Sequence, residues 1–204
     1  VLQQHEREPH AFIRPDLFVV VAGSTAEDEE ALFHAATPPG VQLLCAPRKP
    51  ERFDEAAAGL PGCVRRSQTK SSQTPPNTTS DRFLLDSIGE LRQAYALADV
   101  VVVGRSFGDL YGSDPLEPIG LGKPTVIGPS VSDFATIVAA LESDGGIMRS
   151  TPQKIAQTLS QLLENKAFAT ELAVGGRRSI RKHQGASQRQ AQLVADLVLS
   201  SHQR

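Results

Sequence analysis

The chain has 204 residues and a formal net charge of −2 at pH 7, with 40% hydrophobic and 22% charged residues. This composition indicates a globular protein, and the balanced charge argues against nucleic acid as a partner. No apolar run approaches the roughly 20 residues that a membrane helix needs. The two cysteines, Cys45 and Cys63, have no CxxC spacing, which favours a reducing compartment over a disulfide or zinc framework.

The first half of the chain alternates short apolar runs with helical patterns. Residues 1–16 are polar and predict a linker, which leaves 17–204 as one domain. Strands are predicted at 17–22, 41–46, 63–66 and 83–86, and helices at 24–36, 51–58 and 87–97. Residues 67–80, rich in Ser, Thr, Gln and Pro, predict a mobile surface loop.

The second half begins with four valines, 100–103, which predict a strand buried on both faces. A helix is predicted at 115–121, with Asp114 as N-cap, Pro115 in its first position and Glu117 completing a capping box. A sixth strand at 123–128, a helix capped by Ser132, a helix after Thr151 and a last amphipathic helix at 186–199 follow. This alternation predicts a Rossmann-like α/β fold with a doubly wound parallel sheet.

Three Ser/Asp-x-x-Glu pairs follow predicted strands: Ser24 with Glu27, Ser87 with Glu90, and Asp114 with Glu117. In a parallel sheet these helix N-termini would share one edge, where their free N–H groups favour an anion. Arg48 follows the second strand and would reach the same edge as a clamp for a phosphate. The sequence therefore predicts a nucleotide site there.

A structural explanation stands beside this one, because each pair taken singly is an ordinary helix cap. Arg48 and Lys49 can equally be a solvated pair. The chain contains no G-x-G-x-x-G, P-loop, HExxH or G-x-S-x-G motif. His34 is expected on a helix surface, and His183 lies in a basic stretch that is either solvated or rests on acidic lipid headgroups.

Several segments, read in order, resemble the 3-deoxy-D-manno-octulosonic acid (Kdo) transferases, which add Kdo sugars to lipid A. The strongest are Pro-Arg-Lys-Pro-Glu-Arg-Phe at 47–53 and Asp-Pro-Leu-Glu-Pro at 114–118. Ala-Gly-Ser-Thr at 22–25, Asp-Ser-Ile-Gly-Glu-Leu at 86–91, Gly-Lys-Pro at 122–124 and the stretch 128–134 add to the match. The resemblance runs from about residue 17 to the final helix.

The resemblance implies the C-terminal half of a two-domain GT-B glycosyltransferase, which grips the CMP of the donor CMP-Kdo. It places Arg48 on the phosphate and Glu117 on the ribose hydroxyls. The full predicted donor-binding set is Ser24, Thr25, Pro47, Arg48, Lys49, Ile88, Gly89, Glu90, Asp114, Pro115, Leu116 and Glu117.

The resemblance also implies an inverting transfer that needs no metal or other cofactor. The catalytic base and the lipid A surface would lie in an N-terminal half outside this chain, so no catalytic residue is expected here. The whole protein would act at the cytoplasmic face of the inner membrane, with peripheral contact to the membrane surface left open. Since the sequence begins Val-Leu-Gln-Gln, we expect a piece of a longer protein that is nearly inactive alone.

The chain departs from the family pattern at four places. Ser113-Asp114 stands where the family has His-Asn, Lys49 where it has His, Asp133 where it has Asn, and Arg105 where a small residue is usual. Asp114 adds negative charge near a phosphate, which Arg105 or Lys49 would offset. Two other functions therefore stay open: a UDP-type transferase or epimerase of the same fold, and a non-catalytic nucleotide-binding module.

Overall fold

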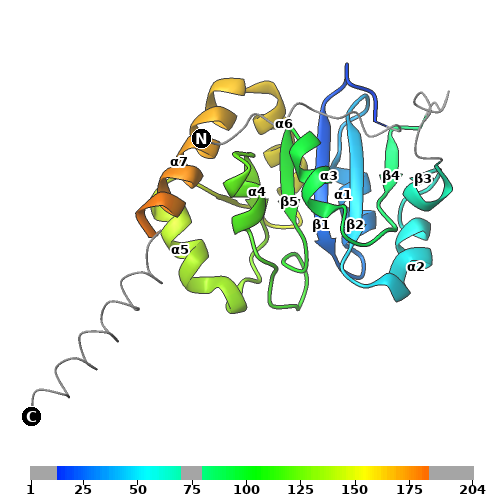
Figure 1. Cartoon of the computed structure of the whole chain (residues 1–204), viewed down its shortest axis with the longest axis horizontal. Coiled ribbons are helices and arrows are strands. Elements are labelled where there is room, and N and C mark those ends of the chain that lie inside the picture. Colours follow the sequence, from blue (N-terminus) through cyan, green and yellow to red (C-terminus); the bar gives the residue numbers. More distant parts are fainter. Residues whose placement is uncertain (1–12, 70–79, 184–204) are drawn as a thin grey trace, which may run out of the picture.

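The computed structural model describes residues 13–69 and 80–183 (Figure 1). Most of the predicted linker, most of the predicted loop at 67–80 and all of the predicted helix at 186–199 lie outside these ranges. Strands are β1 (Val19–Thr25), β2 (Gln42–Pro47), β3 (Val64–Arg65), β4 (Arg82–Leu84), β5 (Val100–Val103), β6 (Thr125–Ile127) and β7 (Met148–Arg149). Helices are α1 (Glu29–Ala36), α2 (Phe53–Ala58), α3 (Leu91–Leu97), α4 (Leu116–Gly120), α5 (Ala135–Ser143), α6 (Ile155–Glu164) and α7 (Lys166–His183), with single 3-10 turns at Pro50–Arg52, Arg66–Gln68 and Ser132–Phe134.

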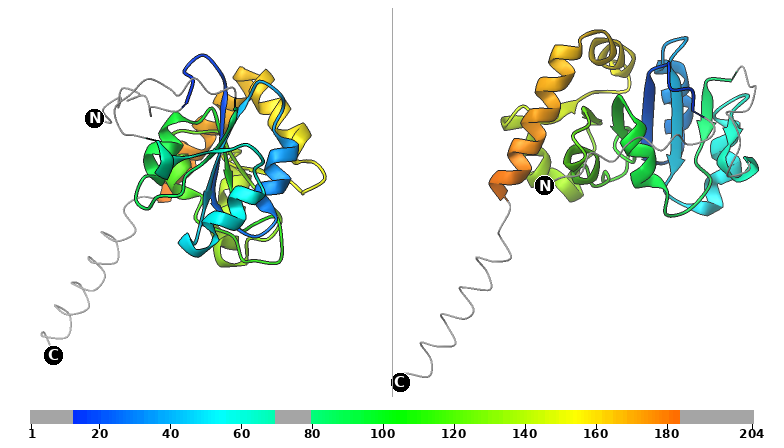
Figure 2. Two further views of the ribbon diagram at one scale, coloured as in Figure 1. Left: turned by 90° about the vertical axis from the view of Figure 1, so that its right-hand side faces the viewer. Right: turned by 45° about the horizontal axis from the view of Figure 1, so that its top comes forward.

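All the strands of the described chain join one parallel sheet in the order β3-β4-β2-β1-β5-β6-β7. Apart from the two-residue β3, this is the Rossmann strand order, with β1 at the centre between β2 and β5. Helices cover both faces of the sheet (Figure 2). The predicted doubly wound parallel sheet is confirmed, and β7, which is only two residues long, is a strand that the sequence pattern did not indicate.

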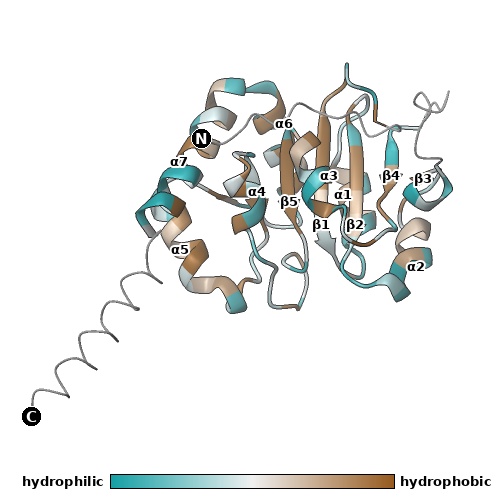
Figure 3. Cartoon of the chain, viewed as in Figure 1, coloured by the Kyte–Doolittle hydropathy of each residue, from teal (hydrophilic) through white to brown (hydrophobic). Residues whose placement is uncertain are grey.

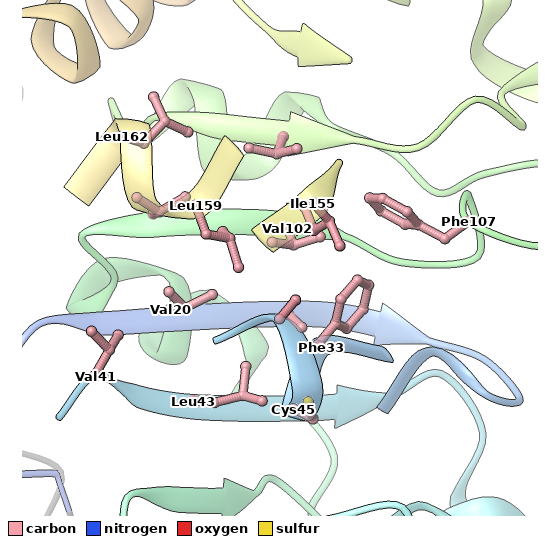
Figure 4. Close-up of a cluster of buried hydrophobic side chains, with 14 of the residues drawn as sticks. Val20, Phe33, Val41, Leu43, Cys45, Val102, Phe107, Ile155, Leu159 and Leu162 are labelled. Carbon is pink, nitrogen blue, oxygen red and sulfur yellow. The ribbon is translucent and has the colours of Figure 1, made fainter. Parts of the chain in front are cut away.

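Alternate residues of each strand point to opposite faces of the sheet, as the period of two in a strand requires. On one face Val20, Leu43 and Val102 pack with Phe33 of α1 and Leu159 of α6 (Figure 4). Figure 3 shows the central strands as the most hydrophobic part of the fold. The opposite face carries two further clusters, one under α3 and one under α4 and α5.

The capping-box prediction for Ser24 is wrong. Strand β1 runs on through Ser24 to Thr25, Ser24 has a left-handed φ of 57°, and α1 begins only at Glu29. Likewise α3 begins at Leu91 instead of Ser87. Both helices still end where the sequence indicated, since α1 ends at Ala36 and α3 at Leu97.

The basic stretch of α7 is partly used inside the protein. Arg177 donates to the backbone oxygen of Leu121 at 2.9 Å, and Arg178 donates to that of Asp144 at 2.9 Å. Lys182 forms an ion pair with the Asp144 carboxylate. These contacts fasten α7 to the turns after α4 and α5. The side chain of His183 lies outside the described part.

His34, expected on a helix surface, is half-buried instead. Its Nδ1 accepts a hydrogen bond from Arg82 Nε at 3.0 Å. Arg82 in turn donates to backbone oxygens of Val41 and Thr37, at 3.1 and 3.2 Å. His34 therefore belongs to a polar cluster that joins the end of α1 to strand β4.

Replacing Leu159 by alanine is expected to lower the free energy of unfolding by about 2–5 kcal/mol, because its buried side chain fills the space between α6 and the sheet. Urea denaturation of the purified chain measures this loss. Val174→Ala on α7 removes an exposed apolar side chain and should change the same free energy by less than about 0.5 kcal/mol. Equal effects of the two substitutions would contradict the position assigned to α6.

Candidate functional site

The candidate site is the edge of the sheet where the parallel strands end. Chain order reverses at β1, because the chain passes from β1 to β2 on one side and later to β5 on the other. Ligands of doubly wound sheets bind at such a switch point, outside the carboxyl ends of the strands. The loops that follow β1, β2 and β5 meet at this edge (Figure 1).

A single buried carboxylate, that of Glu29, joins the loops after β1 and β5. One of its oxygens accepts from the backbone N–H groups of Ala26 and Arg105, at 2.9 and 2.7 Å. The other accepts from Ser106 and Phe107, both at 3.0 Å. An ionised carboxylate is suited to this task, since it accepts several hydrogen bonds and donates none. Glu29 thereby fixes the backbone of Arg105 in its left-handed conformation, with φ of 57°.

A second buried carboxylate, that of Glu30, fastens the loop after β2. Arg52 donates to both of its oxygens, at 3.2 and 3.1 Å, and to the backbone oxygen of Thr25 at 3.3 Å. The Thr25 hydroxyl donates to Glu30 at 2.5 Å. The side chain of Thr25, a predicted donor-binding residue, is thus buried and engaged within the protein. Glu27, which was predicted to complete a capping box with Ser24, is exposed.

Arg48 and Lys49 stand at the end of β2, next to this fastened loop. The backbone N–H of Arg48 donates to Thr25 at 3.0 Å, which brings the loops after β1 and β2 together. Both side chains are exposed, and neither forms a hydrogen bond or ion pair with the described residues. Pro47 before them is buried. Two cations are therefore free at this edge to meet an anion.

The loop after β4 is tied to the turn after β3. The buried Asp86 carboxylate accepts from the backbone and hydroxyl of Ser67, at 2.7 and 2.5 Å, and from Arg65 at 2.6 Å. Burial alone would raise the pKa of Asp86, but these hydrogen bonds outweigh it and hold the pKa below its ordinary value. Asp86 therefore stays ionised and anchors the loop that carries the predicted residues 88–90.

Of those three residues, Glu90 is already engaged. Its carboxylate accepts from Arg66 at 2.9 Å and from the Ser87 hydroxyl. Ile88 is 72% exposed, and Gly89 has a φ of +91° that other residues rarely adopt. Ile88 and Gly89 are thus presented on the surface, while Glu90 holds the loop in shape.

The loop after β5 leads into the short helix α4. The N-cap of this helix is Pro115 and not Asp114 as predicted, although the Asp114 carboxylate just before it accepts from the backbone N–H of Leu116 at 2.8 Å. Pro115 is buried, and Leu116 is half-buried. The Glu117 side chain is 41% exposed and lies 3.5 Å from Arg92 of α3. Among the described residues Glu117 is therefore held only by this loose ion pair, and the return bond of a capping box is not seen.

The edge also holds residues that the sequence analysis did not select. Tyr95 of α3 packs against Gly23 at the end of β1, where an added Cβ would meet the tyrosine oxygen at 2.0 Å. Burial, and after it the nearby carboxylates of Glu117 and Asp114, raise the pKa of Tyr95. Glu29 was missed because nothing in the acidic run 27–30 distinguishes it. Tyr95 was missed because it fits the apolar pattern of its helix.

No group of three or more His, Cys, Asp or Glu side chains could hold a metal ion within 13–69 and 80–183. In the same part of the chain, no helix has both the length and the apolar character needed to cross a membrane.

The chain resembles known proteins over most of its length, although no family model matches it. It is 31% identical over 189 residues to the 3-deoxy-D-manno-octulosonic acid transferase of Bordetella pertussis, covering 87% of this chain and 44% of that protein. It is 30% identical to the Haemophilus influenzae transferase, covering 76% of this chain and 37% of that protein. The chain thus spans less than half the length of these curated relatives.

Among solved structures, the C-terminal CMP-Kdo binding domain of WaaA from Acinetobacter baumannii superimposes with a TM-score of 0.74 at 29% identity. The match covers 81% of this chain and 90% of that domain. The fold and its ligand edge define a C-terminal Rossmann-like domain of a GT-B glycosyltransferase. Within that class, the chain is a homologue of the 3-deoxy-D-manno-octulosonic acid transferases, as its sequence motifs indicated.

Glu29→Gln is expected to lower the free energy of unfolding by about 2–4 kcal/mol, because the amide nitrogen of glutamine would leave two of the four backbone donors unpaired. Urea denaturation at neutral pH measures the loss. Glu27→Gln makes the same chemical change at an exposed site and should be nearly silent. If both variants matched the parent chain, the bridging role of Glu29 would be refuted.

Proposed function

We propose that this chain is the donor-binding domain of a transferase that takes Kdo from CMP-Kdo. The observation that carries the proposal is the likeness to the CMP-Kdo binding domain from A. baumannii, together with two free cations at the ligand edge. Arg48 and Lys49 offer positive charge where the phosphate of CMP would lie. An arginine fork suits a phosphate, because it donates two parallel hydrogen bonds.

The remaining predicted residues divide by what their side chains are free to do. Glu117 is half-exposed and loosely paired, so its carboxylate can accept from the ribose hydroxyls of a nucleotide. Ile88 and Gly89 present a surface on which a pyrimidine can rest. Ser24, Thr25, Glu90 and Asp114 shape the backbone of the loops, and in this proposal they contribute main-chain contacts or support.

In the proposed reaction, an acceptor hydroxyl attacks the anomeric carbon of Kdo with inversion. The new carbon–oxygen bond forms as the bond to the phosphate oxygen breaks, and CMP departs with that electron pair. The proton of the acceptor hydroxyl passes to a base outside this chain. Arg48 stabilises the charge that grows on the leaving phosphate, a role that requires no metal ion.

The acceptor and the setting are parts of the same proposal. Lipid A precursor would bind a region of the whole protein outside this chain, at the cytoplasmic face of the inner membrane. Arg181 is an exposed cation on α7 and is suited to a peripheral contact with acidic headgroups. The chain alone would bind the donor nucleotide and transfer Kdo very poorly.

Calorimetry with CMP, UMP, AMP and GMP tests the proposal on the isolated chain. CMP is expected to bind one to one and about tenfold or more tighter than UMP, since the two bases differ in hydrogen-bonding groups. Tighter binding of UMP would assign the chain to a UDP-type transferase or epimerase. If no nucleotide bound, a non-catalytic interaction module would replace the proposed function.

Arg48→Ala should weaken CMP binding by about 1.5–3 kcal/mol, the range for a hydrogen bond to a charged group. Cytidine, which lacks the phosphate, should lose little. Arg181→Ala on α7 is the matched control, since it removes an exposed arginine from a different element and should leave CMP affinity unchanged. Equal loss of CMP and cytidine in the Arg48 variant would assign Arg48 a structural role.

A further inference from the structure

The side chain of Tyr95 lies close to the ligand edge but has no role in the site described above. It lies on α3, beneath the ligand edge, and its side chain is only 2% exposed. Its ring packs in the apolar cluster on that face of the sheet. Side chains of a helix lean toward the helix N-terminus, which for α3 is the end at the carboxyl edge of the sheet. The hydroxyl accordingly reaches Gly23, near the end of β1.

Tyr95 also lies on the side of α3 that faces Glu117. Arg92 and Tyr95 are three residues apart on α3 and therefore share one face of that helix. Arg92 approaches the Glu117 carboxylate at 3.5 Å, so this face of α3 is turned toward the start of α4. The carboxylates of Glu117 and Asp114 are near enough to raise the pKa of Tyr95 together with burial. The tyrosine hydroxyl therefore stays protonated and able to donate.

The hydroxyl has no hydrogen-bond partner among the described residues. Its oxygen is not among the fully enclosed, unpaired side-chain atoms of the described residues, so it meets solvent at the ligand edge. A hydroxyl in that position can bond to a ligand, which phenylalanine could not do. The Tyr95 hydroxyl can donate a hydrogen bond, and the nearby Glu117 carboxylate can accept one. Together they suit a ligand group that both donates and accepts, such as a hydroxyl.

We propose that Tyr95 is a ligand-contacting residue that donates its hydroxyl hydrogen to a ribose hydroxyl of the bound nucleotide. The inference rests on the proposed function and adds a second protein group at the ribose. A ribose hydroxyl donates its own hydrogen to Glu117 and accepts from Tyr95, so the two residues satisfy it together. A 2′,3′-dideoxyribose offers neither bond and leaves both protein groups without a ligand partner. The pair thereby selects nucleotides whose sugar carries this hydroxyl.

Tyr95→Phe tests the inference, because it removes one oxygen and keeps the ring against Gly23. Calorimetry is expected to show CMP binding about five- to tenfold weaker, the effect of one lost hydrogen bond. Binding of 2′,3′-dideoxy-CMP should be equal in the variant and the parent chain.

Two results would overturn the inference: unchanged CMP affinity in the Tyr95 variant, or equal weakening of CMP and dideoxy-CMP. If the parent chain binds no CMP, the proposed function itself fails, which separates the two failures. A second measurement avoids any loss of folding in the variant. With ¹³C-labelled tyrosine, CMP should shift the Cζ resonance of Tyr95 and dideoxy-CMP should not, and an unmoved resonance at saturation would refute the contact.

Discussion

Four backbone N–H groups converge on the carboxylate of Glu29, and the shape of the ligand edge depends on that convergence. Two donors come from the loop after β5 beyond Arg105, one from Arg105 itself and one from the loop after β1. The two loops flank the switch point of the sheet, where a doubly wound fold binds its ligand. Without a fixed negative charge between them, four buried donors would lack partners at this point. The carboxylate makes a rigid floor from two loops that are far apart in the sequence.

Around this floor, the charged residues of the edge divide into two kinds. Glu29, Glu30, Asp86 and Glu90 are paired with backbone donors or with arginines, and they hold the loops in place. Arg48 and Lys49 form no such bonds with the described residues, and Glu117 is only loosely paired. Ligand binding costs little conformational entropy at the paired residues, because they are already ordered. The free ones supply the charge that a nucleotide would meet.

Much of the fold could be predicted from the sequence, since it follows from local patterns. The valines at 100–103, the apolar run before Gly23 and the breaks at prolines and glycines indicate strands and helices whose ends mostly agree with the structure. The start of α1 could not be predicted, because Thr25 extends β1 by pairing with Pro47 of β2 beyond an irregularity at Ser24. The role of Glu29 depends on partners 76 to 78 residues away, and no spacing within 24–30 carries that information. The motif at 47–53 indicated Arg48, while Arg52 in the same motif proved to be the residue that fastens the loop.

The most direct measurement is a crystal structure of the chain soaked with CMP. The nucleotide is expected at the carboxyl edge between β1 and β5, with its phosphate in hydrogen-bond reach of Arg48 and its ribose beside Glu117. The backbone around Glu29 should not move, because its four hydrogen bonds are made before the ligand arrives. CMP bound elsewhere on the domain, or bound at this edge with its phosphate turned away from Arg48, would contradict the account.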